Sequence, residues 1–101
     1  MRREFATFAD FYPHYLRQHA HASCRRLHFV GTTLVAIGLL AAAWLGEPWL
    51  VPAAIAAGYG FAWVGHLFFE HNRPATFSHP LYSIAGDWVM YRDMLTGRIR
   101  W

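Results

Sequence analysis

Two long apolar segments dominate the pattern of hydrophobic and polar positions. Between Arg26 and Glu70 the only charged residue is Glu47, which separates apolar segments of 18 and 21 residues at 29–46 and 49–69. As helices, both can cross a hydrocarbon core of ~30 Å. The chain has 101 residues, and too few lie outside these segments to cover two all-round apolar helices. We therefore predict an all-α integral membrane protein with a two-span hairpin; a soluble core hairpin is the alternative.

A shorter amphipathic helix is predicted before the first apolar segment. Residues 7–19 place large apolar side chains at helical spacing, namely Phe8, Phe11, Tyr12, Tyr15 and Leu16. Pro13 is compatible with a helix only near its start. Aromatic rings suit the headgroup level of a bilayer, and Arg17 can extend its charge to water. We expect this helix to lie at the membrane interface or to pack on the end of the hairpin.

Small capping residues predict where the other helices begin and end. They are Ser23, Gly46, Ser78 and Gly97. Ser23 and Gly46 predict a helix from Cys24 to Leu45, with the glycine in the left-handed C-cap conformation. Ser78 and Gly97 enclose a last helix with Pro80 in its first turn. Residues 1–101 are therefore predicted to form a single membrane-embedded helical domain, with amphipathic or interfacial helices flanking the hairpin.

The basic residues all lie outside the turn of the hairpin. Of the nine, five precede it and four follow it: Arg2, Arg3, Arg17, Arg25 and Arg26, then Arg73, Arg92, Arg98 and Arg100. Because basic residues gather on the cytoplasmic side of membrane proteins, both termini are predicted to be cytoplasmic. A nucleic-acid-binding protein would interleave arginines with exposed aromatic residues along one surface. We therefore expect no nucleic-acid partner.

Four histidines are expected to meet at the cytoplasmic edge of the hairpin. His28 lies nineteen residues before Glu47, and His66 lies nineteen residues after it. In an antiparallel helix pair, equal residue counts place two side chains at the same depth. His19 precedes the first span and His79 follows the second, so their segments enter the same region. The sequence predicts a metal site formed by His19, His28, His66 and His79.

The predicted donor set narrows the choice of metal. Glu70, four residues after His66, lies on the same helical face one turn away. Cys24 is the single cysteine, which excludes a cysteine-based zinc site within one chain. Imidazoles with one carboxylate suit non-haem Fe(II), and they would also bind zinc or manganese. A haem held by two histidines between facing helices is the main alternative cofactor.

Other polar residues receive different interpretations. Three of the seven histidines lie outside the predicted ligand set, namely His14, His21 and His71. The first two are predicted not to be ligands, since His14 lies more than a turn before the helix break and His21 faces away from His19; the position of the third stays open. Asp87 lies in an apolar helix, where a carboxylate either pairs with an arginine such as Arg73 or Arg92 or orients a histidine. Of these two, the ion pair is the favoured interpretation.

Several motifs resemble one family of membrane proteins. They are Tyr15 with His19, HxxxxCxxxHxxG from His19 to Gly31, GHLFFEHNRPA from Gly65 to Ala75, and HPLYS from His79. They are similar to those of small bacterial members of the family that includes the fungal endoplasmic-reticulum Fe(II)-dependent dioxygenase acting on 2-hydroxy fatty acids. The resemblance covers residues 8–98, and Cys24 stands where the family often has asparagine. The matching motif residues are His19, His28, His66 and Glu70.

The resemblance implies an Fe(II)-dependent dioxygenase of the bacterial inner membrane, which oxidatively shortens 2-hydroxy fatty acids by one carbon with O2 as co-substrate. A 2-hydroxy acid can chelate iron through its carboxylate and hydroxyl groups. Arg73, Arg25 or Arg26 can pair with that carboxylate, which a guanidinium fits bidentately. Glu70 is expected to be a ligand or to orient one. A small haem-binding or non-catalytic membrane subunit is the competing function, and the sequence specifies no oligomeric state.

Overall fold

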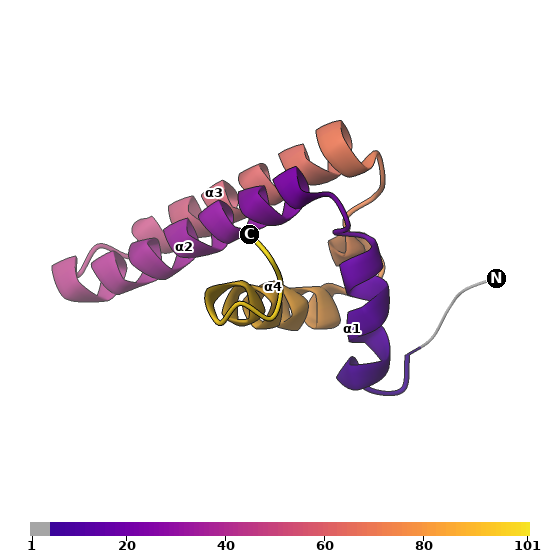
Figure 1. Ribbon diagram of the computed structural model, residues 1–101. Coiled ribbons are helices and arrows are strands. Elements are labelled where there is room, and N and C mark those ends of the chain that lie inside the picture. Colours follow the sequence, from indigo (N-terminus) through magenta and orange to yellow (C-terminus); the bar gives the residue numbers. More distant parts are fainter. Residues whose placement is uncertain (1–4) are drawn as a thin grey trace.

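The computed structural model describes residues 5–101, and most of this length is helical (Figure 1). In chain order the elements are α1 (Phe8–Arg17), α2 (Ala22–Leu45), α3 (Leu50–Gly65), the π-helical turn η1 (His66–Glu70), the 3₁₀ turn η2 (Ala75–Phe77) and α4 (Pro80–Leu95). Across residues 5–101 there is no strand, which confirms the all-α prediction for this part of the chain. Arg2 and Arg3, part of the predicted charge distribution, lie outside the described residues.

The antiparallel hairpin of α2 and α3 is the longest feature of the fold (Figure 1). The two backbones come close at Gly31 and Gly58, where a Cβ atom added to Gly31 would lie 2.9 Å from the Gly58 carbonyl oxygen. Small residues allow such an approach between helices. At the other end, Gly46 closes α2 with a φ of 67°, the left-handed conformation predicted for it.

Most of the apolar surface of the hairpin is uncovered. Near the turn, Leu40 is 72% exposed and Trp44 is 89% exposed. Ala22–Leu45 and the continuous helical run Leu50–Glu70 are both long and apolar enough to cross a membrane, and only 22% and 17% of their apolar windows are buried inside the protein. By length and composition, the structure therefore contains two candidate membrane spans.

Two predicted helix caps are wrong by one or two residues. α2 begins two residues earlier than predicted, because His21 is its N-cap and accepts a hydrogen bond at Nδ1 from the Ser23 N–H at 3.1 Å. α4 begins at Pro80, one residue later than the predicted Ser78 cap implies, because its N-cap is His79; Pro80 lies in the first turn as predicted. In both places a histidine occupies the cap position that the sequence pattern assigned to a nearby serine.

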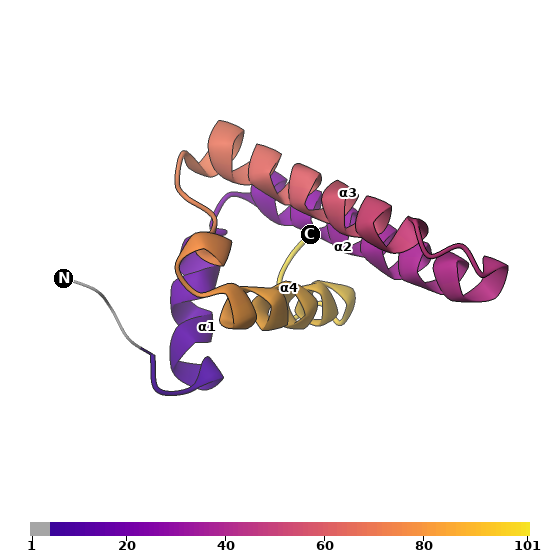
Figure 2. The same ribbon diagram turned by 180° about the vertical axis from the view of Figure 1, so that it is seen from behind.

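α1 and α4 pack against each other beside the hairpin, as the opposite views in Figures 1 and 2 show. They share the buried residues Phe11, Tyr15, Met90 and Met94, with Ala75 from η2. α4 also contacts α2, where the ring of Tyr91 stacks on that of Phe29 with centroids 4.4 Å apart. The Tyr91 hydroxyl forms a hydrogen bond of 2.8 Å with Thr33. α4 is therefore fixed to the hairpin as well as to α1.

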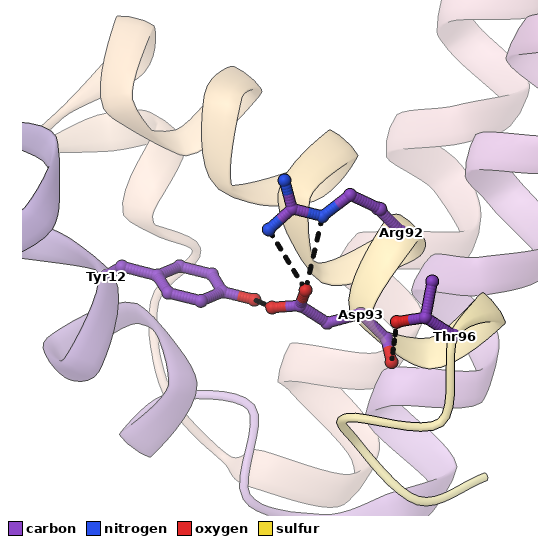
Figure 3. Close-up of polar contacts among 4 residues, drawn as sticks. All are labelled: Tyr12, Arg92, Asp93 and Thr96. Carbon is purple, nitrogen blue, oxygen red and sulfur yellow. Dashed lines mark hydrogen bonds and ion pairs between the residues drawn. The ribbon is translucent and has the colours of Figure 1, made fainter.

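A polar contact fastens α1 to the far end of α4 (Figure 3). The Tyr12 hydroxyl donates to Asp93 Oδ2 at 2.7 Å, and Arg92 pairs with Oδ1 of the same carboxylate at 3.1 Å. Burial, together with the bond to Asp93, raises the pKa of Tyr12, so the phenol keeps the proton that it donates. The ion pair favoured for Asp87 is wrong: Arg92 pairs with its neighbour Asp93, and Asp87 accepts instead from the Tyr15 hydroxyl.

Replacing Gly86 by alanine is expected to loosen the contact between α1 and α4. A Cβ atom there would lie 2.8 Å from two carbons of the Tyr15 ring, and overpacking of this kind costs ~1–3 kcal/mol. Denaturant unfolding in detergent should show this loss in the free energy of unfolding. Gly60→Ala is the matched control, since nothing lies within 4 Å of its added Cβ, and it should stabilise α3 by ~0.5–1 kcal/mol. Equal stability of the two variants would contradict the packing argument.

Candidate metal centre

Three histidine rings from three separate segments form one buried cluster. His19 follows α1, His28 lies in the second turn of α2, and His66 opens η1. The ring centroids are 4.4 Å apart for His19 and His28, 4.5 Å for His19 and His66, and 5.0 Å for His28 and His66. The rings of this three-histidine cluster are almost fully excluded from solvent. The predicted equal depth of His28 and His66 is confirmed.

The Nδ1 atoms of His19 and His28, on the outer side of the cluster, form hydrogen bonds with backbone carbonyl groups. His19 Nδ1 lies 2.6 Å from the Tyr15 carbonyl oxygen, and His28 Nδ1 lies 2.9 Å from that of Cys24. Because a carbonyl oxygen can only accept, each Nδ1 carries the proton. The Nε2 atom of each neutral ring is therefore unprotonated and offers a lone pair.

A π-helical turn orients His66 in the same way. Its carbonyl oxygen accepts from the Asn72 N–H at 3.1 Å, and His71 takes a φ of 57° where the chain reverses. This path returns the Asn72 side chain to the histidine, with Oδ1 2.6 Å from His66 Nδ1. Asn72 Nδ2 donates to the Gln18 carbonyl oxygen at 3.2 Å, so Oδ1 is the acceptor and His66 Nδ1 is protonated. Single π-helical turns are frequent at functional sites.

The Nε2 atoms of His19 and His28, which point into the cluster, are acceptors that face each other. His19 Nε2 and His28 Nε2 are 3.0 Å apart, although neither carries a proton in the tautomers set by its outer contact. Buried acceptors facing without a donor are unfavourable, and a cation bound by both removes the cost. At this separation, one ion could lie within the ~2.0–2.1 Å typical of a metal–imidazole bond from both nitrogens. The donors of the three-histidine cluster therefore fit a metal ion.

Cys24 completes the buried group of potential ligands. The ligand atoms of His19, Cys24, His28 and His66 all lie within 4.8 Å of one another. The thiol sulfur is 3.7 Å from His28 Nδ1, which is the outer nitrogen of that ring. Gly65 of α3 packs directly on the thiol, since a Cβ at that position would lie 3.0 Å from Sγ. Cys24 thus packs where α2 and α3 meet beside the cluster.

His19 is held by the segment that joins α1 to α2. Its ring stacks on that of Tyr15 with centroids 4.0 Å apart. Arg25 donates to the backbone carbonyl oxygens of His19 and Ala20, at 3.1 and 2.6 Å. Burial, and then the neighbouring His28, lower the pKa of His19 well below its usual range. The ring is therefore neutral at physiological pH, as a metal ligand must be.

Glu70 and Arg73, the predicted catalytic residues, lie outside the buried cluster. Glu70 Oε2 accepts from the His21 backbone N–H at 2.5 Å, at the start of α2. A carboxylate is favourable at a helix N-terminus, so this bond ties the end of η1 to α2. Arg73 is exposed, and its guanidinium lies 5.7 Å from the centre of the Phe77 ring.

The remaining histidines also lie apart from the cluster. The structure does not bring His79 to it: that ring packs near Phe5 and Phe11, with centroids 5.2 and 5.4 Å away. His14 packs on the same two phenylalanines. His21 caps α2, and His71 is exposed at the chain reversal after η1.

Asp87 and Trp63 border a small space beside the cluster. This space is ≈10 Å³, close to the ~10–15 Å³ that holds one water molecule. Trp63 Nε1 is buried without a hydrogen-bond partner. Asp87 accepts from the Tyr15 hydroxyl, and burial raises the pKa of its carboxyl to about 6. The residues around this space therefore include a tryptophan with an unpartnered N–H and a buried carboxyl group, together with the three histidines.

Asn72 is a site residue that the sequence patterns did not single out, since it appeared there only inside the GHLFFEHNRPA motif. The available signal was an amide side chain six residues after His66 and two residues before Pro74. Its contact depends on the π-helical turn, which no periodicity in the sequence predicts.

A family model described as "2-hydroxy-palmitic acid dioxygenase Mpo1-like" matches residues 5–99. The chain belongs to the Mpo1-like family. Searches of curated proteins and of solved structures give no match. Membership of the Mpo1-like family confirms the resemblance seen in the motifs and indicates a dioxygenase-related function with a fatty-acid link. The buried cluster of this Mpo1-like protein, which can hold a metal ion, is the corresponding candidate site.

Proposed function

We propose that this Mpo1-like protein is an Fe(II)-dependent dioxygenase that shortens 2-hydroxy fatty acids by one carbon. The observation that carries the proposal is the pair of unprotonated nitrogens, His19 Nε2 and His28 Nε2, that face each other beside His66. The family description, which names a 2-hydroxy-palmitic acid dioxygenase, supports the substrate class. Bound Fe(II) would supply the site at which O2 and the hydroxy acid react.

The proposed reaction needs no reductant besides the substrate. One 2-hydroxy acid and one O2 give the acid one carbon shorter, CO2 and water, and atoms balance. The bond between C1 and C2 breaks, C2 is oxidised to the new carboxyl carbon, and O2 takes up the electrons. A haem-binding role is disfavoured because the three imidazole rings contact one another directly, which leaves no room for a macrocycle between them.

The chain's own residues have separate proposed roles around this ion. His19, His28 and His66 would hold it through Nε2, while the oxygen acceptors at each Nδ1 fix the tautomers. Asp87 and the Trp63 N–H would form hydrogen bonds with the polar end of the substrate, since both residues line the small space beside the cluster and the Trp63 N–H has no other partner.

Glu70 and Arg73 are proposed to act from the edge of the site. Glu70 is a positioning residue, because its bond to the His21 N–H holds η1 against α2. Arg73 would attract the incoming carboxylate. Its exposed guanidinium lies over Phe77, whose ring is 5.4 Å from that of Trp63. His79 is not retained as a ligand in this proposal, since its ring packs with Phe5 and Phe11.

We also propose that α2 and the run Leu50–Glu70 span the bacterial inner membrane with both termini in the cytoplasm. The arginine distribution and the uncovered apolar surface support this orientation. A membrane-impermeant maleimide added to intact cells should label a Glu47→Cys variant and leave a Trp101→Cys variant unlabelled. The native Cys24 is fully buried and should not react. Labelling only at position 101 would contradict the orientation.

Oxygen consumption tests the proposed activity directly. Protein purified without oxygen and loaded with Fe(II) should consume O2 at least roughly 100-fold faster with 2-hydroxy-palmitic acid than with palmitic acid, which lacks the second chelating oxygen. Mass spectrometry should find the product one carbon shorter. Equal rates with the two acids, or no consumption with either, would refute the activity. An intense Soret band in the visible spectrum would indicate haem instead.

A further inference from the structure

A cavity of ≈250 Å³ runs from the three-histidine cluster along the hairpin, between the hairpin and α4. The wall on α2 is formed by His28, Thr32, Val35 and Leu39. Their spacing of four, three and four residues is that of one helical face. The facing wall on α3 contains Ile55, Tyr59 and Ala62, which continue the face that begins at His66. The two rows therefore start together at the cluster and run side by side towards the turn.

The polar groups gather mainly at one end of this cavity. His28 and Asp87 line both the cavity and the small space beside the cluster, so the two spaces are adjacent. Ile84 and Trp88 of α4 form the third wall. Beyond them, mainly apolar side chains line the cavity. A ligand that fits must carry a polar group at one end only.

The end of the cavity away from the cluster is lined by Leu39 and Ile55, which are 39% and 44% exposed. They belong to the two candidate membrane spans, so this end of the cavity lies in the apolar part of a bilayer in the proposed orientation. A lipid-soluble chain can therefore reach it from the bilayer without crossing water.

The length of the cavity matches one class of occupant. The eleven residues from His28 to Leu39 rise ~1.5 Å each, which gives ~16 Å. An extended chain advances ~3.6 Å over three bonds, or ~1.2 Å per bond, so this distance takes up ~14 bonds. That is the span from C2 to the terminal methyl group of a sixteen-carbon acid.

We propose that this cavity is the acyl-chain site and that it ends at Leu39 and Ile55, beyond which further methylene groups gain no contact with the protein. The inference rests on the proposed function, because it assigns the polar end of the substrate to the three-histidine cluster. Each methylene that enters the cavity should strengthen binding by about fourfold, the factor expected for one buried methylene. The gain should stop when the chain reaches Leu39 and Ile55.

Replacing Leu39 by tryptophan tests the proposal, with Leu40→Trp as a matched control. Both changes put the same ring on α2, but Leu40 is 72% exposed and does not line the cavity. Equilibrium binding of radiolabelled 2-hydroxy-palmitic acid to the Fe(II)-loaded protein in detergent, without O2, measures the chain site apart from turnover. Competition by unlabelled 2-hydroxy acids of eight to eighteen carbons gives the dependence on chain length.

Leu39→Trp is expected to weaken binding of 2-hydroxy-palmitic acid at least tenfold and to leave a ten-carbon acid unchanged. Leu40→Trp should match the unmodified protein at every length. Ile55→Trp, on the facing helix, should reproduce the Leu39→Trp profile. If Leu39→Trp does not fold, Ile55→Trp provides the same test. Identical profiles for the Leu39 or Ile55 variants and the Leu40 control would overturn the assignment. If the unmodified protein binds no 2-hydroxy acid, the proposed function itself fails, and the inference falls with it.

Discussion

Replacing His28 or His66 by alanine is expected to lower the iron content of the purified protein at least about tenfold and to abolish O2 consumption with 2-hydroxy-palmitic acid. Each change leaves two inward-facing imidazoles where three now converge within 5.0 Å of one another. Loss of a residue that orients a metal ligand typically lowers metal affinity about 10–100-fold, and loss of a ligand itself lowers it at least as much. Iron analysis after anaerobic purification measures the effect. His19→Ala should behave in the same way.

His14→Ala is the matched control for these variants. Its ring packs with Phe5 and Phe11 at centroid distances of 5.2 and 6.0 Å, outside the three-histidine cluster. The variant should keep its iron, even if it is somewhat less stable. Size-exclusion chromatography in detergent should confirm that every variant is folded before iron is counted. Full iron retention in His66→Ala would remove the basis of the proposed function.

Replacing Asn72 by alanine is expected to weaken iron binding about 10–100-fold while the three ligands stay in place. Asn72 Oδ1 accepts from His66 Nδ1 at 2.6 Å and so keeps the Nε2 lone pair pointed at the cluster. Without this acceptor, the proton can move to Nε2 and the ring can rotate. Competition with a chelator of known affinity measures the change in dissociation constant.

Asn72→Asp separates the orientation of His66 from the contact between Asn72 and Gln18. The aspartate keeps an acceptor for His66 Nδ1 and loses only the donation to the Gln18 carbonyl oxygen. It should therefore retain much tighter iron binding than Asn72→Ala. Equally weak binding in both variants would show that the contact with Gln18, and not the orientation of His66, controls the site.

The apolar pattern predicted the parts of the site that depend on regular helices. Glu47 marks the turn, and equal counts of nineteen residues on each side, most of them helical, placed His28 and His66 at one depth, which the ring distance of 5.0 Å confirms. Gly46 was correctly assigned to the left-handed C-cap because that conformation favours glycine. Periodicity works here because each helical residue adds the same rise and rotation.

The same reasoning failed in the irregular segments of the chain. His66 and Glu70 were placed on one face of a regular helix, but the chain there is a π-helical turn, and Glu70 bonds to the backbone N–H of His21. His79 was expected to join the other ligands because its segment begins near them. Its ring instead packs with the aromatic side chains of the N-terminal segment. Proximity of a segment does not fix the direction of a side chain.

By itself, the sequence determined the helical class, the two long apolar segments, the family membership through its motifs, and the meeting of His28 with His66. These follow from composition, helical period and local capping, which act within one segment. Only the tertiary structure decided that Asn72 orients His66, that Asp87 accepts from Tyr15, and that a cavity links the cluster to the far part of the hairpin. These features depend on contacts between segments up to 72 residues apart, which the helical period does not encode.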